Sequence, residues 1–236
     1  MAMKDLDALL LLGGQGTRLR SVISDKPKPL AEVGGRPFLD ILLEHAASSG
    51  LERFILCTGY RAAAVRSFIQ DHLRRGEFVF SEEDRPLGTG GAVKQAEPWI
   101  RSDPFFVFNG DSYCAADLVG FLDFFLGRGA LISMVLAETK TSDDFGSVEM
   151  DRSGRILSFR EKAGAPTAWI NAGIYLFSKN VLEAIPAGTP CSLEKEIFPK
   201  LTRREFFGFP TKEALIDIGT PERLASAQRH VFGRRP

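Results

Sequence analysis

The sequence contains few cysteines. Three of its 236 residues are cysteine, and Cys57, Cys114 and Cys191 stand far apart without the spacing of metal ligands. An odd, scattered set excludes a disulfide framework and a cysteine-based zinc site. We therefore expect reduced and mostly buried thiols, which are typical of cytosolic proteins.

An excess of charge of one sign is also missing. Lysine and arginine total 30, and so do aspartate and glutamate. This balance excludes the broad basic field that drives nonspecific binding to nucleic acid, so no nucleic-acid partner is expected and any phosphate site must be local. The apolar run at residues 8–12 is too short for a signal peptide or a membrane span. We expect a cytoplasmic protein without a membrane partner.

Internal repeats and low-complexity linkers are absent from the sequence as well. A length of 236 residues and a hydrophobic content of 44% are enough for a sizeable core. We therefore expect one domain over residues 1–236.

The stretch from Leu9 to Leu30, LLLLGGQGTRLRSVISDKPKPL, organises the chain. Its apolar start is typical of a buried parallel strand that ends in a turn. Three glycines within residues 13–16 expose backbone N–H groups, and such a nest favours anionic oxygens. Arg18 and Lys28 follow, and the prolines beside Lys28 limit the entropy lost when its ammonium is held against an anion. The pattern predicts a phosphate site.

Two familiar glycine motifs do not fit this stretch. Leu19 stands where the dinucleotide-binding fingerprint needs a glycine, and the Gly-Lys-Ser/Thr triplet of a P-loop is absent. A tight turn with solvated basic residues is the simpler alternative for a lone glycine cluster. Arg18 and the two Lys-Pro pairs favour the phosphate site over that alternative.

The segment LLGGQGTRLRSVISDKPKPLAEVGGRP resembles the signature of the sugar-1-phosphate nucleotidyltransferases, whose GGxGTRL loop and downstream PKPL hold the triphosphate of a nucleotide. Later motifs extend the resemblance over nearly the full length. It implies an enzyme of the α/β class, a Rossmann-like three-layer α/β/α sandwich with a mixed, mainly parallel sheet of the nucleotide-diphospho-sugar transferase type. The nucleotide-binding half then spans about residues 1–129 and the sugar-phosphate-binding half about residues 130–236.

The periodicity of apolar residues predicts elements that suit this fold. We expect helices over residues 37–49 and 60–73 and strands over residues 53–59 and 76–83, which form a βαβ arrangement. From residue 130 the pattern changes to strand-like runs joined by short turns. The second half should therefore add antiparallel or mixed strands.

A second glycine-rich segment, EEDRPLGTGGAVKQA at residues 82–96, resembles the family's base-recognition loop, with flat glycine backbone expected before a helix begins. A glycine-rich helix start is the alternative. The Glu83 carboxylate can accept from both N1–H and N2–H of guanine, which favours guanine over uracil or thymine; a solvated loop acid is its alternative. The nucleotide-binding residues that the resemblance implies are Leu12, Gly13, Gly14, Gly16, Thr17, Arg18, Lys28, Glu83, Pro86, Gly88, Thr89, Asn109 and Gly110.

Two aspartates stand where a divalent metal is expected. Asp111 follows Gly110 at the end of a buried strand, and ligands of open α/β sheets bind beyond such strand ends. Asp217 ends a short apolar strand and precedes a helix capped by Thr220. In the family, the aspartates of the matching motifs share one ion, so the resemblance implies Mg²⁺ on Asp111 and Asp217. A turn-forming residue is the alternative for Asp111.

The resemblance assigns the sugar phosphate to the second half of the chain. Lys162, after Glu161, resembles the family lysine that contacts the sugar phosphate. Asn171 and Gly173, in NAGIY, and Glu194, in SLEKEIFP, match motifs that approach the sugar ring. Surface ion pairs are the alternative, and for Glu194 an acid in the first turn of a helix.

These motifs imply the substrates and the reaction. A sugar-1-phosphate oxygen attacks the α-phosphorus of a nucleoside triphosphate and pyrophosphate leaves, with Arg18, Lys28, Asp111, Lys162 and Asp217 aligning the groups and neutralising charge. The motifs look most like those of heptose-1-phosphate guanylyltransferases, which make GDP-heptose from GTP. A mannose-1-phosphate guanylyltransferase, a UTP- or dTTP-dependent relative and a non-catalytic nucleotide-sugar-binding regulatory module stay open. So does assembly into a homo-oligomer, which is frequent in the family.

The proposed roles of Arg18 and Asp111 predict a loss of turnover. Arg18→Ala and Asp111→Asn each remove a contact to charge that develops in the transition state, which costs about 3 kcal/mol, or a rate factor on the order of a hundred. Turnover, measured as pyrophosphate release, should therefore fall far more than nucleotide affinity. Unchanged turnover in either variant would remove that residue from the mechanism.

Overall fold

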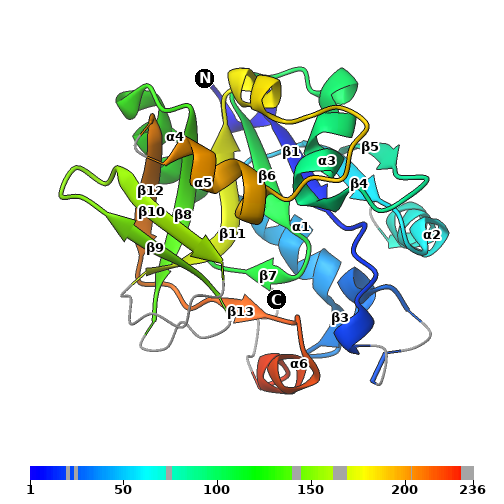
Figure 1. Ribbon diagram of the computed structural model, residues 1–236. Coiled ribbons are helices and arrows are strands. Elements are labelled where there is room, and N and C mark those ends of the chain that lie inside the picture. The colour runs from blue at the N-terminus through cyan, green and yellow to red at the C-terminus, as the bar shows by residue number, and fades with distance from the viewer. Residues whose placement is uncertain are drawn as a thin grey trace.

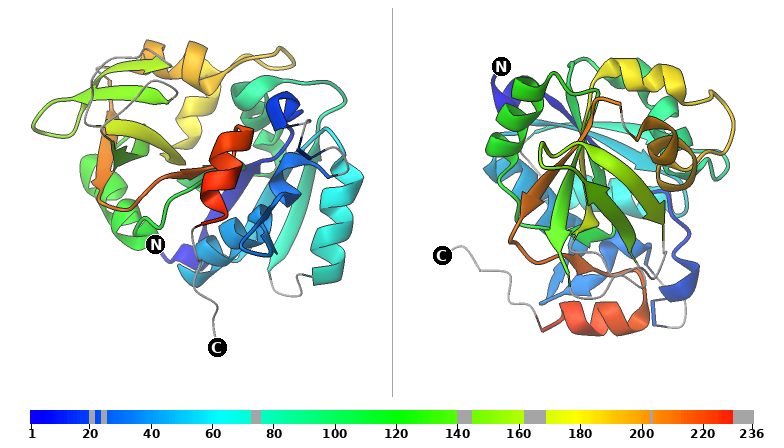
Figure 2. Two further views of the ribbon diagram at one scale, coloured as in Figure 1. Left: turned by 90° about the horizontal axis from the view of Figure 1, so that it is seen from below. Right: turned by 60° about the vertical axis from the view of Figure 1, so that its left-hand side comes forward.

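The computed structural model describes residues 1–19, 22–23, 26–72, 76–139, 145–161, 169–202 and 204–229. Within this part, one nine-stranded sheet runs through both halves of the chain, and helices cover both of its faces (Figures 1 and 2). The expected α/β sandwich with a mixed sheet is confirmed. The strands of this sheet are β1 (Asp7–Leu11), β4 (Arg53–Thr58), β5 (Glu77–Glu82), β6 (Phe105–Asn109), β8 (Ile132–Glu138), β9 (Gly146–Met150), β10 (Ile156–Glu161), β11 (Trp169–Phe177) and β12 (Phe206–Thr211).

Shorter strands and the helices complete the fold. Two small antiparallel pairs, β2 with β3 and β7 with β13, lie outside the main sheet. No helix in the described ranges is long and apolar enough to cross a membrane. The remaining strands and the α-helices are β2 (Glu32–Val33), β3 (Arg36–Pro37), β7 (Ser112–Tyr113), β13 (Ile216–Asp217), α1 (Phe38–Ser48), α2 (Ala62–His72), α3 (Gly88–Gln95), α4 (Leu118–Arg128), α5 (Phe198–Leu201) and α6 (Pro221–Ala227).

The first half of the chain builds the parallel part of the sheet. Its strands lie in the order β5, β4, β1 and β6, and all three pairings between neighbours are parallel. Strand β1 therefore lies between two parallel partners, and its carboxyl end meets the carboxyl end of β6, where Leu11 is in register with Asn109. The predicted strands and helices of this half are confirmed as β1, α1, β4, α2 and β5.

Strand β11 joins the two halves and the sheet branches along it. Ile174 to Phe177 pair antiparallel with β6, whereas Trp169 and Ile170 pair with β9. Strand β8 pairs with the opposite edge, with a register shift between Asn171 and Tyr175. Gly173 sits in this irregularity with a φ of +76°, which glycine adopts without a steric penalty. The predicted mixed strands of the second half are confirmed.

Alternation of side chains along each strand divides the apolar core into two clusters. Leu10 of β1 packs with α1, α2 and α4 on one face, and Leu9 packs with α3 and α5 on the other. All three cysteines are buried and free of disulfides, as predicted. Because both faces are covered, ligands can reach the parallel strands only at their ends.

The segment Gly88–Gly91 corrects one expectation. These glycines do not precede a helix but form the first turn of α3. The N–H groups of Gly90 and Gly91 donate to the carbonyl oxygen of Cys191, and a Cβ at Gly88 would lie 2.6 Å from the same oxygen. Close packing of the start of α3 against Cys191 therefore explains these glycines. This agrees with the alternative interpretation of the segment as a glycine-rich helix start.

The tight contact between the ends of β1 and β6 predicts a cost for Gly110→Ala. An added Cβ would lie 2.5 Å from the backbone oxygen of Leu11 and 2.6 Å from Cδ2 of Leu12. Overpacking of this kind costs about 1–3 kcal/mol, so the free energy of unfolding in urea should fall by that amount.

Gly127→Ala in α4 is the matched control for Gly110→Ala. Its Cβ would meet no heavy atom within 4 Å, and alanine favours a helix over glycine by up to about 1 kcal/mol. A stability loss as large in Gly127→Ala as in Gly110→Ala would contradict the packing explanation.

Candidate functional site

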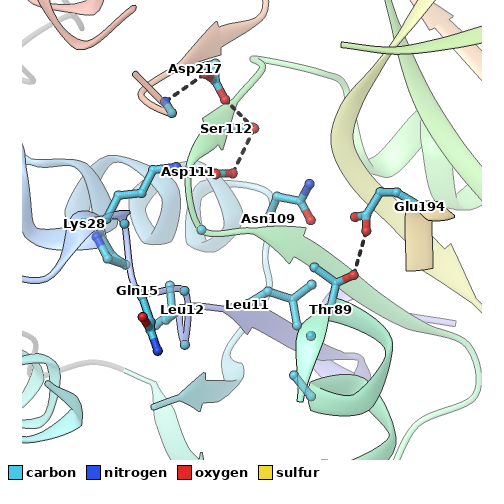
Figure 3. Close-up of a pocket in the computed structure, with 18 of the residues that line it drawn as sticks. Leu11, Leu12, Gln15, Lys28, Thr89, Asn109, Asp111, Ser112, Glu194 and Asp217 are labelled. Atoms are coloured by element: carbon cyan, nitrogen blue, oxygen red, sulfur yellow. Dashed lines mark hydrogen bonds and ion pairs between the residues drawn. The ribbon is translucent and has the colours of Figure 1, made fainter. Parts of the chain in front are cut away.

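A cavity of about 460 Å³ opens at the carboxyl ends of β1 and β6, and both halves of the chain line it (Figure 3). This is where ligands of open α/β sheets bind. Most of the residues that the sequence predicted for the site line this cavity. These are Leu12, Gly13, Gly14, Gly16, Thr17, Arg18, Lys28, Glu83, Pro86, Gly88, Thr89, Asn109, Gly110, Asp111, Asn171, Glu194 and Asp217.

Three predicted residues are not among those that line the cavity. Gly173 lies behind it, and a Cβ there would lie 3.0 Å from the Cβ atoms of Asn109 and Ser112, so any larger residue would displace them. Glu161 ends β10, and Lys162 lies outside the described residues.

The glycine loop after β1 lies close to two side chains that the sequence predicts for the site. A Cβ at Gly13 would lie 3.1 Å from Oε2 of Glu83, and one at Gly16 would lie 3.2 Å from Cβ of Lys28. Gly16 also has a φ of +56°, which disfavours other residues. The loop thus presents backbone between a carboxylate on one side and an ammonium on the other.

Lys28 and Asp111, which both line the cavity, form an ion pair. The Lys28 ammonium donates to Oδ2 of Asp111 at 2.5 Å, and the Lys28 side chain is 11% exposed. Burial alone would raise the pKa of Asp111, but the Lys28 charge and hydrogen bonds from Lys28 and Ser112 outweigh it, so the pKa lies below its ordinary value. Asp111 is therefore ionised at neutral pH, the form in which a carboxylate binds cations.

Asp217 lies beside Asp111 through a shared neighbour. The Ser112 hydroxyl lies 3.2 Å from Oδ1 of Asp111 and 3.5 Å from Oδ2 of Asp217, and its single proton can serve one of them at a time. The Asp217 Oδ1 atom accepts from Gly219 N–H and from Arg223, each at 2.8 Å. Each carboxylate therefore directs one oxygen toward Ser112.

Two carboxylates suit a magnesium ion that takes its other ligands from water and substrate, and they are too few for a metal site built from protein ligands alone. The described residues contain no group of three or more His, Cys, Asp or Glu side chains that could hold a metal. Mg²⁺ is commonly bound through one or two carboxylates, with water and substrate phosphates as its other ligands. Asp111 and Asp217 are the residues that could hold such an ion.

Glu83 follows β5, and strands β4 and β1 lie between β5 and β6, after which Asp111 comes. Its Oε2 accepts from Leu87 N–H at 3.4 Å, and the side chain is half-buried. Burial raises the pKa of Glu83, and the hydrogen bond from Leu87 offsets only part of that effect. A half-buried carboxylate beside glycine backbone is suited to accept hydrogen bonds from a ligand that replaces water there.

A hydrogen-bond network joins α3 to the segment that carries Glu194. The Thr89 hydroxyl donates to Oε2 of Glu194 at 2.6 Å, and Ser192 donates to the same oxygen at 2.9 Å. Thr89 in turn accepts from Leu193 N–H at 2.9 Å. Glu194 is thus held by one oxygen in the π-helical turn Leu193–Ile197.

Two amides lie between this network and the aspartates. The Asn109 and Asn171 amides donate to the hydroxyl of buried Tyr175 at 3.3 and 2.7 Å, and Asn171 Oδ1 accepts from Gly173 N–H. Figure 3 shows Asn109 between the Thr89–Glu194 pair and the Asp111–Ser112–Asp217 chain. Asn109 Oδ1 is buried and has no hydrogen-bond partner among the residues that the structure describes, so it can accept from a ligand.

Several residues of the cavity wall were not predicted from the sequence, among them Gln15, Ser112, Phe145 and Arg223. Gln15 and Ser112 lie inside the motifs already noted, so motif position would have found them. Arg223 faces Asp217 because it is in the first turn of α6, where its N–H donates to the capping Thr220. Phe145 had no sequence signal, since only the fold brings β9 to this end of the sheet.

Comparison with known proteins gives consistent matches. The family described as Nucleotidyl transferase matches residues 7–232. The chain is 38% identical over 227 residues to a mannose-1-phosphate guanylyltransferase of Mycobacterium tuberculosis, covering 94% of this chain but only 63% of that protein. It is 30% identical over 227 residues to D-glycero-alpha-D-manno-heptose 1-phosphate guanylyltransferase of Aneurinibacillus thermoaerophilus, covering 96% and 98%.

A solved structure is similar over the same extent. The crystal structure of HddC from Yersinia pseudotuberculosis has a TM-score of 0.84 and 37% sequence identity, covering 94% of this chain and 98% of that one. HddC has also been crystallised in complex with GMP-PN, with a TM-score of 0.83 to this chain.

The raised pKa of Glu83 predicts a pH-dependent effect of Glu83→Gln on stability. A raised carboxylate pKa favours the protonated folded state, so the wild type loses stability as pH rises from the ordinary value of 4.5 through the folded value. Glutamine does not titrate. Glu83→Gln should therefore gain stability relative to the wild type over this pH window, measured as the free energy of unfolding in urea.

The exposed neighbour Glu82 is the control for the pH experiment, because Glu82→Gln removes a carboxylate from the same strand end. Because the Glu82 side chain is exposed, its replacement should not give the gain in stability that the burial of Glu83 predicts. A Glu83→Gln difference that is constant from about pH 4 to pH 7 would refute the burial effect.

Proposed function

Because the chain belongs to the nucleotidyl transferase family, we propose that it is a sugar-1-phosphate guanylyltransferase that joins GTP to heptose 1-phosphate and releases pyrophosphate. The observation that carries this proposal is the arrangement of one cavity. The cavity is lined by a glycine loop with Arg18 and Lys28, by the carboxylate pair Asp111 and Asp217, and by Glu83.

The nucleotide lies across the ends of β1 and β6 in this proposal. The N–H groups of the glycine loop and the Arg18 and Lys28 side chains hold its phosphates, and the guanine base lies toward Glu83. Guanine offers two adjacent donors, N1–H and N2–H, that an ionised carboxylate accepts together, whereas uracil and thymine offer one. The complex of the similar protein HddC with GMP-PN supports a guanine nucleotide.

The reaction is a displacement at the α-phosphorus of GTP. An oxygen of the sugar 1-phosphate forms a bond to this phosphorus while the bond to the pyrophosphate oxygen breaks. Because the attacking oxygen is already anionic, no base has to remove a proton, so catalysis depends on alignment and on neutralising charge. Arg18 stabilises the departing pyrophosphate, and Lys28 stabilises the nucleotide phosphates.

A divalent metal belongs to this chemistry. Nucleotidyltransferases of this family generally use one, and we propose Mg²⁺ held by Asp111 and Asp217. When bound, the ion neutralises phosphate charge and aligns the phosphate oxygens. The two carboxylates contribute negative oxygens that already lie on either side of Ser112.

The sugar phosphate occupies the part of the cavity that the second half lines. Glu194 is held by Thr89 and Ser192 through one oxygen, Oε2, in position to accept from sugar hydroxyls. Asn171 lies on the same wall. Lys162, with Glu161, is proposed from the family resemblance to hold the incoming phosphate. In this arrangement residues 1–129 bind mainly the nucleotide and residues 130–236 mainly the sugar phosphate.

Heptose 1-phosphate is the preferred sugar because the two relatives named for it match along their whole length. The chain covers 98% of the Aneurinibacillus thermoaerophilus protein and 96% of the Campylobacter jejuni protein of the same name. Mannose 1-phosphate is the second candidate, because the mycobacterial mannose enzyme has higher identity, 38%, although the chain spans 63% of it. A cytoplasmic location stays a prediction.

Pyrophosphate release by the purified chain tests the proposal. With Mg²⁺ and GTP, turnover is expected with heptose 1-phosphate and, at lower kcat/KM, with mannose 1-phosphate; UTP, dTTP, CTP and ATP should be poor substrates. Glu83→Gln should reduce the preference for GTP over UTP. The uncharged amide has one acceptor oxygen and an NH2 donor, so it cannot accept from both guanine donors as the two oxygens of the carboxylate can.

Each other outcome has a defined meaning. Turnover only with UTP or dTTP would refute the guanine assignment, and a nucleotide preference unchanged in Glu83→Gln would remove Glu83 from base recognition. Absence of turnover with every pair would overturn the catalytic proposal in favour of a binding module. Glu82→Gln, an exposed carboxylate next to Glu83, should leave the preference unchanged.

A further inference from the structure

Arg223 contacts Asp217, one of the two carboxylates proposed to bind the metal ion. The sequence motifs assign Arg223 no role. Its Nη1 donates to Oδ1 of Asp217 at 2.8 Å, and its Cζ lies 4.1 Å from the ring centroid of Phe145. The Arg223 side chain is 20% exposed and Asp217 is 11% exposed. Stacking on an aromatic face at this distance fixes the plane of a guanidinium.

The two carboxylates of the site are held in the same way. Lys28 occupies Oδ2 of Asp111, and Arg223 occupies Oδ1 of Asp217. The remaining oxygen of each carboxylate lies near the Ser112 hydroxyl. In each aspartate, the oxygen bound by the cation therefore fixes the side chain. The other oxygen is directed toward Ser112, between the two carboxylates.

The same arrangement balances charge. Two carboxylates and two protein cations sum to zero, so a metal ion that approaches the free protein meets no net negative charge from these four side chains. A divalent ion is repelled by each nearby cation as strongly as it is attracted by a carboxylate at equal distance. The triphosphate of a nucleotide adds the negative charge that the four side chains lack.

We propose that Arg223 is a positioning and charge-balancing residue that keeps the affinity of the free protein for divalent metal low, so that the metal binds together with the nucleotide. This inference rests on the proposed function, because it takes Asp111 and Asp217 as the metal ligands. It adds an order to that function: a stable metal site forms only when the nucleotide phosphates supply charge.

Binding of Mn²⁺ to the protein without nucleotide tests this directly, with the electron paramagnetic resonance signal of unbound Mn²⁺ as the readout. Arg223→Met removes the charge and keeps a long side chain over Phe145. Its affinity for Mn²⁺ should exceed that of the wild type by on the order of tenfold, as expected for the loss of one unit charge close to a divalent ion. Adding GMP-PN should raise the Mn²⁺ affinity of the wild type more than that of Arg223→Met.

Arg223→Lys is the matched control, because it keeps the charge and should bind Mn²⁺ like the wild type. Asp217→Asn in the Arg223→Met background should abolish the gain, which places the ion on Asp217. Equal or weaker Mn²⁺ binding by Arg223→Met, in a protein whose unfolding transition is intact, would overturn the proposal. So would a gain that persists in the double variant.

The outcome is separable from that of the proposed function. The Mn²⁺ measurement needs neither sugar phosphate nor turnover, whereas the proposed function is judged by pyrophosphate release. Turnover with GTP and no metal-affinity change in Arg223→Met would refute only the role of Arg223. A gain in Mn²⁺ affinity without turnover for any substrate pair would refute only the reaction.

Discussion

The ion pair between Lys28 and Asp111 is the interaction on which the site depends. The two residues are 83 positions apart in the chain, yet their charged atoms lie 2.5 Å from each other. Parallel pairing of β1 with β6 brings them together, because parallel neighbours end at the same edge of a sheet. The glycine loop after β1 and the aspartate after β6 thereby line the same cavity. The Lys28 ammonium keeps the pKa of the Asp111 carboxyl low, and the ionised carboxylate is the form that binds a metal ion.

The C-terminal part of the chain completes this cavity from the other side. Strand β13 pairs with β7, which places Asp217 in register with Ser112, next to Asp111. Helix α6 follows at once, and its last turn is fastened to the β2–β3 hairpin, where Gln228 bonds Glu32 and Gly34. Figure 1 shows α6 beside β3 at the bottom of the molecule. These hydrogen bonds hold helix α6 beside the hairpin that follows the Lys28 segment.

Glycines and polar residues of α3 join the two halves of the chain by close packing and hydrogen bonds, in addition to the ligand binding proposed for them. The first turn of α3 packs so closely on Cys191 that only glycine fits at position 88. Thr89, in the same turn, bonds Glu194 across the boundary between the halves. The wall proposed for the nucleotide is therefore connected by hydrogen bonds to the wall proposed for the sugar. A change in one wall can alter the other without any contact to its ligand.

The sequence by itself determined the local features of this protein. The βαβ order, the loop after β1 and the strand-end aspartates follow from apolar periodicity, glycine and the cap at Thr220, all of which act over a few residues. Only the tertiary structure decided that Arg223 and Phe145 join the site, that Gly173 lies behind it, and that the glycines of α3 pack on Cys191. These relations depend on contacts between residues far apart in the chain, and such contacts are set by sheet order and helix packing, which leave no periodic signal in the sequence.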